Sequence, residues 1–381
     1  MPQDPTATCD VAVIGGGVIG LSIAWRAAQR GCSVRLYERG ELGGGASRVA
    51  AGMLAPVTEA DPGERALLEL GLRSARMWPS FAAELAETAA CDLSLRRCGA
   101  LVIARDDDEA RALERELALR LAMGLDVERL LPTAARKREP ALTPSVRLAL
   151  AVASDQAVDP RAMVVALAEA SRRAGVALYT HANVERISCE RAKIRGLQLA
   201  GGEIVAARAV VIASGAWTGA LDGLPEAARF ALRPVKGQIM RLRDPAGPGL
   251  LERIVRFDGG YLVPRGDGRY VLGATMEERG FDTSVTAGGL YELLRDAGEV
   301  VPGIHELIVE ETAAGLRPAT PDNAPVLGRS DALEGLHWAT GHHRNGILLA
   351  PVTAELVAAE LDGREAVPAS FAARRLEKVA A

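Results

Sequence analysis

The chain has 381 residues, which is too many for one small core and fits two domains of ordinary size. Hydrophobic residues make up 49% of the chain and charged residues 25%, a balance that excludes an intrinsically disordered protein. The formal net charge is −4 and no basic stretch stands out, so no nucleic-acid partner is expected.

The cysteines and the N-terminus bear on the cellular compartment. The five cysteines form no CxxC pair and no metal-ligand spacing, so we expect reduced thiols and no bound metal. Met1–Cys9 lacks a cationic segment before an apolar stretch and is therefore not expected to be a signal peptide. No apolar run approaches the ~18–20 residues of a membrane-spanning helix. We expect a soluble cytoplasmic protein with no membrane partner.

The first forty residues have the pattern of a strand, a helix and a second strand. Asp10–Ile14 is a short apolar strand, and Gly15–Gly20 is a glycine-rich turn. Leu21–Arg30 has helical spacing and ends before Gly31, a residue that favours helix termination. Val34–Tyr37 is the second strand. This order predicts a βαβ unit at the start of the chain.

The glycine-rich turn has the spacing of a dinucleotide-binding site. Gly15, Gly17 and Gly20 fit the G-x-G-x-x-G pattern, and Glu38 follows 18 residues after the last glycine. Glycines let the backbone approach a pyrophosphate, which then meets the positive end of a helix. The Glu38 carboxylate can accept both ribose hydroxyls. The alternative is a purely structural glycine turn between the strand and the helix.

NAD and FAD share this motif, and a later segment helps to choose between them. Ala209–Ala213 is an apolar strand that runs into Ser214–Gly215, similar to the later strand of FAD-binding folds. The motif also lies at the start of the chain, with the other candidate site residues dispersed behind it. Both features favour FAD.

The remaining elements alternate between helical and strand patterns. Helices are predicted at Glu64–Thr88, Glu109–Met123, Pro160–Ala174, Gly288–Val300 and Gly346–Leu361. Strands are predicted at Leu101–Ala104, Val176–Thr180 and Asn183–Ser188, with a hairpin formed by Lys193–Leu199 and Gly202–Ala206. An antiparallel sheet is predicted from Gly237–Arg241, Ile254–Phe257, Gly260–Pro264 and Tyr270–Ala274.

Four further motifs carry a resemblance to a known family. They are AAGMLAP at Ala50–Pro56, RPVKGQ at Arg233–Gln238, AGLRPATP at Ala314–Pro321 and GHHRNGILLAP at Gly341–Pro351. Together they resemble the glycine oxidases, including the thiamine-pathway type, within the FAD-dependent D-amino-acid oxidase and sarcosine oxidase family. The resemblance covers nearly the whole chain. It implies FAD as the cofactor.

The resemblance also implies a fold of class α/β (α+β overall), in which a Rossmann-like FAD-binding domain is interleaved with an antiparallel-sheet substrate domain. The FAD-binding domain is expected at 1–85, 145–228 and 315–381, with a mainly parallel sheet and helices on both faces. The substrate-binding domain is expected at 86–144 and 229–314. Substrate is expected between the two domains, where ligands commonly bind.

Roles for individual residues follow from the same resemblance. Residues implied at the adenosine and pyrophosphate are Val18, Ile19, Glu38 and Arg39, with the backbone of Val184 at the adenine. Residues implied along the pyrophosphate and isoalloxazine are Ala46, Ser47, Ala51, Gly52 and Met53. Residues implied around the flavin ring are His342, His343, Arg344, Asn345, Gly346, Ile347 and Leu348. Catalytic and substrate-binding roles are implied for Arg317, Tyr261 and Arg344.

The chemistry of these residue types supports the implied substrate site, with alternatives left open. Arginine presents a planar fork that holds a carboxylate through two parallel bonds, as Arg317 would do. Each side chain also has a structural interpretation: Arg317 in a surface ion pair, Arg344 pinning a loop, and Tyr261 with its ring in the core. His342 and His343 are interpreted as pocket or loop residues that point in opposite directions along an extended segment.

Two departures from the family concern substrate range and one concerns the flavin. His343 stands where relatives often carry an aromatic ring, and Gly259 where some carry a larger polar residue, so strict preference for glycine is in question. Sarcosine oxidases attach their flavin through a cysteine, and none lies in Thr312–Pro321. Non-covalent FAD is therefore predicted.

The predicted function is oxidation of glycine and other small amines, such as sarcosine and small D-amino acids, by molecular oxygen. The products are the imine or 2-oxo acid and hydrogen peroxide, with thiazole synthase as a possible acceptor of the glycine imine and a homo-oligomer, a tetramer, as the expected state. One alternative is a D-amino-acid dehydrogenase with a non-oxygen acceptor. Another is a flavin-binding subunit without turnover.

Overall fold

The predicted βαβ unit is present at the start of the computed structural model, which describes residues 8–377. Strand β1 (Cys9–Ile14) leads through the glycine turn into α1 (Val18–Gln29), and β2 (Val34–Tyr37) follows. β1 and β2 pair in parallel, from Val11↔Val34 to Ile14↔Tyr37. The expected strand–turn–helix–strand context of the glycine motif is therefore confirmed. Most of Met1–Cys9, the segment not expected to be a signal peptide, lies outside the described residues.

The first sheet is built around β1. Its order is β17 (Val326–Arg329), β18 (Leu336–Thr340), β11 (Ile204–Ile212), β1, β2 and β8 (Ala177–Tyr179), and all neighbours pair in parallel except β17 with β18. β10 (Lys193–Leu199) and β9 (Val184–Glu190) extend antiparallel from the first part of β11. The two strands expected at Gly202–Ala206 and Ala209–Ala213 are thus one strand that pairs first with β10 and then with β1.

The two faces of this sheet are covered differently. Val11 and Val13 face a helical layer made of α1, α3 (Arg65–Ala89), α6 (Pro160–Arg173) and α8 (Gly346–Leu361). Ala12 and Ile14, one residue out of phase, face the other side and pack with side chains of β9 and β10 such as Ile187. The expectation of helices on both faces is corrected: β9 and β10 bury the second face.

The second sheet is mostly antiparallel, as predicted. Its order is β16 (Ile308–Ala319), β12 (Arg233–Arg243), β15 (Arg269–Gly273), β14 (Gly260–Pro264), β13 (Ile254–Phe257), β4 (Ala100–Ala104), β6 (Leu148–Val152) and β5 (Glu128–Leu130). Only β13 and β4 pair in parallel among these neighbours of the described chain. Its helices are α4 (Asp107–Ala122), α5 (Pro132–Arg138) and α7 (Ala287–Val300).

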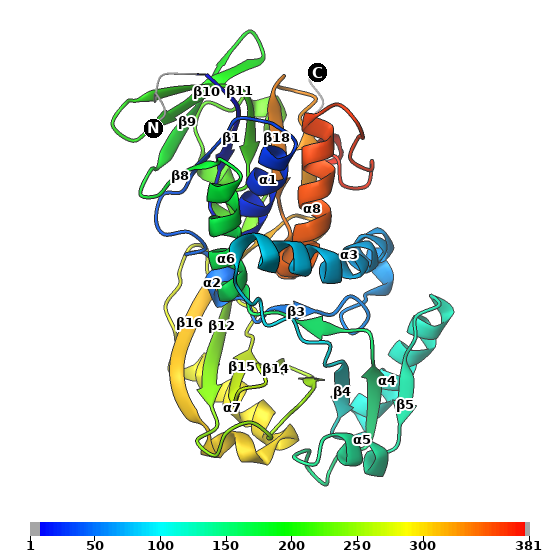
Figure 1. Cartoon of the computed structure of the whole chain (residues 1–381). Helices are drawn as coiled ribbons and strands as arrows, with labels where there is room; N and C mark the ends of the chain where they lie inside the picture. The colour runs from blue at the N-terminus through cyan, green and yellow to red at the C-terminus, as the bar shows by residue number, and fades with distance from the viewer. Residues whose placement is uncertain (1–7, 378–381) are drawn as a thin grey trace.

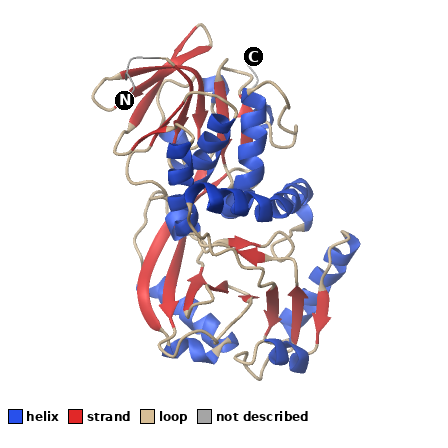
Figure 2. Cartoon of the chain, in the orientation of Figure 1, coloured by secondary structure: helices blue, strands red, loops and turns tan. Residues whose placement is uncertain are grey.

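The two sheets form the two halves of the molecule in Figure 1, with α3 and the short β3 (Met53–Leu54) between them. β3 pairs with β7 (Gln156–Ala157). Figure 2 shows the helical layer concentrated in the half that contains α1 and α8. The short helices are α2 (Ala46–Val49), η1 (Pro62–Glu64), η2 (Gly215–Ala220), η3 (Glu226–Ala228), η4 (Pro302–Glu306), η5 (His343–Asn345) and η6 (Ala373–Arg375).

The chain passes repeatedly between the two halves, so neither half is a continuous segment. β6 lies within the range 145–228 expected for the first domain but pairs with β4 in the second sheet. β16 crosses the expected boundary between 314 and 315. The division into two interleaved domains agrees with the two sheets in outline, and its boundaries stay a prediction. Within residues 8–377, no helix combines the length and apolar character needed to span a bilayer.

Candidate functional site

A cavity of about 2000 Å³ lies where the two sheets meet. The glycine turn, α2 and the start of α8 line it from the first half, and β12, β14 and β16 line it from the second. Residues from 14 to 347 contribute, so distant parts of the sequence meet there. A cavity of this size at the junction of two layers is the preferred place for a cofactor together with a small substrate.

The first wall of the cavity is the N-terminal end of α1. Gly17 is the N-cap and has no side chain to offer, and the Ser47 hydroxyl oxygen accepts a hydrogen bond from the Val18 N–H at 3.1 Å. The Glu38 carboxylate accepts hydrogen bonds from the Gly16 N–H at 2.7 Å and the Gly40 N–H at 2.9 Å. These bonds fix the acid beside the turn. The arrangement fits a phosphate at the helix end and a ribose at the acid.

Two of the motif glycines are required by close contacts. A Cβ on Gly20 would lie 1.9 Å from the Gly15 carbonyl oxygen, so a side chain would push α1 away from the turn. Gly15 has φ +109°, and a Cβ there would lie 2.5 Å from the Ala213 carbonyl oxygen. The turn, α1 and the end of β11 are therefore packed backbone to backbone. A dinucleotide cofactor fits this cradle, and no side chain fills it.

The opposite wall is the start of α8. Its N-cap Asn345 makes no side-chain capping bond in the described structure, and Gly346 and Ile347 line the cavity. The first N–H groups of α8 and its positive dipole end thus face the cavity. Such a helix end can stabilise negative charge on a bound group.

The two adjacent histidines do not lie in an extended segment as expected. His342 is the N-cap of η5 and His343 has φ +45°, so the chain turns sharply here. The buried His342 ring shares a hydrogen bond of 3.0 Å with the Thr353 hydroxyl. His343 lines the cavity, and neither of its ring nitrogens has a hydrogen-bond partner within residues 8–377. An unpartnered, largely buried ring at the cavity wall fits contact with a bound group.

Burial keeps both imidazoles neutral. It lowers the pKa of His342 to about 3. For His343, burial and then the charges of Arg317, Arg344 and Arg233 lower the pKa to about 4. Neither ring carries a proton to donate as an imidazolium near neutral pH. The positive charge of this wall therefore comes from the arginines.

Arg317 and Tyr261 come from two strands of the second sheet and meet in the cavity. Arg317 lies in β16, and Tyr261 is the second residue of β14. Both side chains line the cavity. The Arg317 Nη1 donates hydrogen bonds to the carbonyl oxygens of Thr275 at 3.1 Å and Lys236 at 3.3 Å. Burial raises the pKa of the Tyr261 hydroxyl, while the neighbouring Arg317 charge acts in the opposite direction. The tyrosine stays a neutral donor beside a cation.

The absence of a side chain at Gly237 lets the Arg317 guanidinium lie flat against β12. A Cβ on Gly237 would lie 2.4 to 2.6 Å from the Nη2, Nη1 and Cζ atoms of Arg317. Because β12 carries no side chain at this position, the guanidinium can lie against the strand. One edge of the fork is then bonded to the two carbonyls, and the side chain is set for a planar acid group.

Arg344 both lines the cavity and pins a loop. Its Nη2 lies 3.1 Å from Glu64 Oε2, and its Nε lies 4.0 Å from Glu59 Oε2. Glu59 lines the same cavity. The two interpretations given to this arginine are therefore compatible, and its contact with substrate stays a prediction.

Most of the predicted site residues are brought together, and three lie off the cavity surface. Those that line it are Gly15, Gly17, Val18, Ile19, Glu38, Arg39, Ala46, Ser47, Ala51, Gly52, Met53, Val184, Tyr261, Arg317, His342, His343, Arg344, Gly346 and Ile347. Gly20, Asn345 and Leu348 are not among the lining residues. The Leu348 carbonyl accepts hydrogen bonds from Ser74 Oγ at 2.6 Å and Trp78 Nε1 at 2.9 Å, and its side chain belongs to the core. The roles of all these residues stay predictions.

Sequence reasoning missed several residues that shape the cavity. Trp217 in η2 lies under the Arg39 guanidinium, 3.8 Å from ring centroid to Cζ. Lys236, Gln238 and Glu277 surround the carbonyls that hold Arg317. A tryptophan two residues after Gly215, in a chain with 4% aromatic residues, was the available signal. The RPVKGQ motif was noted, but the role of its lysine depends on a partner 46 residues away.

The described part of the chain has no cluster of metal-ligating side chains. No group of three or more His, Cys, Asp or Glu residues among residues 8–377 could hold a metal ion. The cavity also has no cysteine among its described lining residues.

Comparisons with known proteins agree with this geometry. The family model described as "DAO: FAD dependent oxidoreductase" matches residues 10–360. A glycine oxidase of Geobacillus kaustophilus (strain HTA426) is 37% identical over 93% of this chain and 93% of its own length. A crystal structure of glycine oxidase from Geobacillus kaustophilus has a TM-score of 0.89, with 37% identity, and covers 96% of this chain and 98% of that one. A glycine oxidase of Bacillus licheniformis is 34% identical over 92% of each chain.

Another relative is larger than this chain. The "Bifunctional protein ThiO/ThiG" of Trichormus variabilis (strain ATCC 29413 / PCC 7937) is 34% identical over 92% of this chain but only 52% of its own length. The match therefore spans about half of that protein. The family model and the glycine oxidase matches both extend over most of the chain. The chain therefore belongs to the DAO family of FAD-dependent oxidoreductases and is a glycine oxidase-like amino-acid oxidase.

Proposed function

We propose that the chain oxidises glycine and other small amines, including sarcosine and small D-amino acids, with release of hydrogen peroxide. For glycine the balanced reaction joins glycine, O2 and H2O and gives glyoxylate, NH3 and H2O2, with the imine formed first and hydrolysed afterwards. The observation that carries the proposal is the Arg317 guanidinium, held flat beside the Tyr261 hydroxyl in a cavity that the FAD cradle also lines. The similarity to glycine oxidases supports the substrate class.

The residues of the site supply orientation and charge, not a general acid or base. Arg317 binds the substrate carboxylate through its free guanidinium edge, and Tyr261 donates a hydrogen bond to the same group. FAD, once bound, would supply the two-electron acceptor chemistry that oxidation of the substrate requires. The N-terminal end of α8, which lines the cavity, would stabilise negative charge on the bound group.

The two departures from the family both lie at the cavity wall. A Cβ on Gly259 would lie 2.8 Å from Asp296 Oδ2, and His343 stands where relatives often carry an aromatic ring. We propose that small substituents on Cα or on the amine are accepted, so sarcosine and D-alanine are substrates together with glycine. Glu59 lies near Arg344 and lowers the positive charge of the far wall. A second acid group on the substrate is therefore unfavourable.

A panel of small amines tests this function directly. Purified holoprotein is mixed anaerobically with glycine, sarcosine and D-alanine, and the flavin absorbance near 450 nm is followed. Bleaching followed by peroxide release on adding oxygen is the expected result. Bleaching with dye reduction but slow peroxide release would instead indicate a dehydrogenase. No bleaching with any small amine would leave a flavin-binding subunit without turnover.

The cofactor contacts are part of the proposal. We propose that FAD binds without a covalent bond, with its pyrophosphate at the start of α1 and its ribose at Glu38. Arg39 and the backbone of Val184 would lie at the adenosine end, and Ala51, Gly52 and His343 at the ring end. The domain ranges predicted from the sequence stay the proposal, except that β6, within 145–228, belongs with the substrate-binding domain because it pairs with β4.

A partner and an assembly are proposed on the resemblance. The chain matches about half of the ThiO/ThiG protein, which supports a link of the glycine imine to thiamine thiazole synthesis, with thiazole synthase as acceptor. A cytoplasmic homo-oligomer is proposed for the same reason. Light scattering on the holoprotein measures the assembly. Transfer of label from ¹⁵N-glycine into the thiazole product, in a mixture with thiazole synthase, measures the link.

A further inference from the structure

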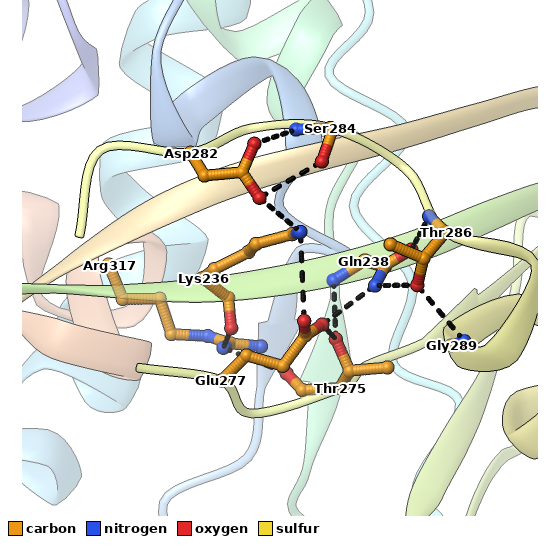
Figure 3. A network of polar contacts seen from close by, with 9 residues as sticks. All are labelled: Lys236, Gln238, Thr275, Glu277, Asp282, Ser284, Thr286, Gly289 and Arg317. Carbon is orange, nitrogen blue, oxygen red and sulfur yellow. Dashed lines mark hydrogen bonds and ion pairs between the residues drawn. The ribbon is translucent and has the colours of Figure 1, made fainter. Parts of the chain in front are cut away.

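The segment that joins β15 to α7, residues 274–286, crosses beside the substrate end of the cavity, and we refer to it as the strap (Figure 3). It begins with Ala274 directly after β15 and ends at Thr286, the N-cap of α7. Most of its residues are exposed. The start of the strap pairs with β12 through the backbone: Glu277 and Lys236 exchange hydrogen bonds of 3.0 and 2.9 Å, and the Thr275 N–H donates to the Gln238 carbonyl at 3.3 Å. Beyond Glu277 the strap has no regular structure, and side chains hold it against β12.

One buried glutamine holds both ends of the strap. The Gln238 Nε2 donates to Glu277 Oε1 at 2.7 Å, near the start of the strap. The Gln238 Oε1 accepts a hydrogen bond from the Thr286 N–H at 2.8 Å, at its end. Gln238 is fully buried, and both functions of its amide are used. Lys236 lies two residues earlier on β12, on the same face, and its side chain contacts the middle of the strap.

That neighbour is a buried lysine. The Lys236 side chain is 1% exposed, and its Nζ lies 2.9 Å from Asp282 Oδ2 and 3.6 Å from Glu277 Oε2. Asp282 in turn caps the backbone, accepting from the Ser284 N–H at 2.9 Å. Burying an ammonium is unfavourable unless it is paired, and an apolar side chain would fill this space more cheaply. The lysine is therefore best explained by what it positions.

The position of the strap decides the position of Arg317. The carbonyl oxygens that accept hydrogen bonds from Arg317 Nη1 belong to Thr275, inside the strap, and to Lys236 itself. The Lys236 carbonyl also accepts from the Glu277 N–H at 3.0 Å. A shift of the strap would therefore move one of the two acceptors that set the angle of the guanidinium. Figure 3 shows the Lys236 side chain directed at Asp282 and Glu277, and the Arg317 guanidinium beside the Lys236 backbone.

The tip of the strap also reaches the cofactor side. The Phe281 ring lies 6.0 Å from the ring of Trp217, which is stacked under Arg39. The strap thus connects the wall at the adenosine end with the carbonyl that holds Arg317.

We propose that Lys236 and Gln238 are positioning residues that hold the strap so that the Thr275 carbonyl sets the Arg317 fork for the substrate carboxylate. This inference rests on the proposed function, in which Arg317 receives that carboxylate. It assigns a role to the buried lysine that the fold alone does not require.

The test uses Lys236→Met, which removes the charge and shortens the side chain by one atom, and Asp282→Asn, which changes an exposed strap residue and leaves the buried lysine in place. Lys193→Met is the matched control, because Lys193 forms a similar Lys–Glu pair of 2.7 Å on the surface of β10. Acetate binding to each holoprotein is measured by calorimetry, together with kcat and KM for glycine. Trypsin cleavage after the exposed Arg279 in the strap is followed by mass spectrometry.

For Lys236→Met we expect the acetate Kd and the glycine KM to rise about tenfold, with kcat within about twofold of wild type. Asp282→Asn should move both constants in the same direction by about threefold. Cleavage after Arg279 should be faster in both variants. FAD content should match wild type, and Lys193→Met should change none of these quantities.

Unchanged acetate Kd and KM in Lys236→Met and Asp282→Asn, with lower thermal stability only, would overturn the positioning role. If Lys236→Met does not fold, Asp282→Asn alone decides. The proposed function fails separately: wild type that binds acetate but oxidises no amine refutes the reaction while the positioning role is still measured. Wild type that does not bind acetate refutes both.

Discussion

Arg317 combines a fixed edge and a free edge in one guanidinium. Two backbone carbonyls hold Nη1, and the group lies flat against Gly237. Arg317→Lys should therefore lose the planar fork and keep the charge. We expect kcat/KM for glycine to fall by about a hundredfold, ~2.7 kcal/mol, because charge-assisted bonds of this kind contribute about 1.5–3 kcal/mol. Steady-state kinetics measure the change.

The flavin content of Arg317→Lys serves as its control, because Arg317 is not predicted to hold FAD. A variant that keeps full FAD and wild-type KM for glycine would show that the carboxylate binds elsewhere. Acetate affinity, measured without turnover, should fall in parallel with kcat/KM.

Substitution of Gly237 should displace the Arg317 guanidinium without removing any charge. In Gly237→Ala the new Cβ would lie within 2.6 Å of the Arg317 guanidinium, which is the far end of a flexible side chain. The fold should tolerate the substitution while the guanidinium swings out of place. We expect the glycine KM to rise about tenfold or more, with a melting temperature within a few degrees of wild type. Gly219→Ala, with open space around its Cβ, is the control. An unchanged KM would contradict the flat packing.

At the scale of elements, the contact between α1 and the glycine turn is set by Gly20. In Gly20→Ala a methyl group would meet the Gly15 carbonyl at 1.9 Å, which only movement of backbone can relieve. We expect loss of most bound FAD and destabilisation by several kcal/mol, of the order found for overpacked cores (about 1–3 or more). The ratio of flavin to protein absorbance and thermal unfolding measure both effects.

Ser22→Ala in the same helix is the matched control for Gly20→Ala. Ser22 is fully buried, and its hydroxyl has no hydrogen-bond partner within residues 8–377. Its removal should leave FAD content unchanged and stability equal or higher. Loss of FAD in both variants would show that FAD binding is sensitive to any substitution in α1. It would then contradict the proposal that the close contact of Gly20 with the Gly15 carbonyl is specifically required.

Because the cavity lining offers no cysteine for a covalent bond within residues 8–377, we expect the flavin to be released on denaturation. No cysteine of residues 8–377 lines the cavity, and β16 carries none beside Arg317. Acid precipitation of the holoprotein should leave a colourless pellet and a yellow supernatant. A yellow pellet after washing would show a covalent bond and contradict the prediction.

The elements that the sequence predicted well are those with a local pattern. The βαβ unit, β13, β14 and α8 have their predicted bounds or nearly so, because apolar period, turn residues and helix ends coincide there. β16 was missed, because its first half is mostly exposed without a regular alternation and its partner β12 lies far away in sequence. Arg317 was found only through its motif. The strap network could not be predicted, since its lysine and aspartate meet only in the folded chain.

The site also shows why a local pattern fails at functional turns. His343 adopts φ +45°, a conformation that a side chain rarely takes, so alternation along an extended segment did not apply. Predicted pocket residues were therefore mostly found through motifs, and their orientation only through the structure.

At the scale of the whole molecule, Asp155 joins the two halves. It is fully buried after β6, and its carboxylate accepts from the N–H groups of Val57 at 3.4 Å and Thr58 at 3.0 Å. From the other side the buried Arg120 of α4 donates to the carbonyls of the same two residues, at 3.1 and 2.9 Å. Thr58 lines the cavity. The loop at the substrate end is thus held between an acid and an arginine.

Burial raises the pKa of Asp155 from 3.8 to about 7, against the two N–H groups, which favour the ionised form. Because the folded pKa is raised, the stabilising contribution is complete below the unfolded value near 4 and is lost as pH rises towards 7. Asp155→Asn keeps an acceptor oxygen and does not titrate. Its melting temperature relative to wild type should therefore increase between about pH 4 and about pH 7. A difference that stays constant or falls over this range would show that the N–H groups outweigh burial and that the acid is ionised throughout. The glycine KM, followed over the same range, then reports whether the loop moves with the proton.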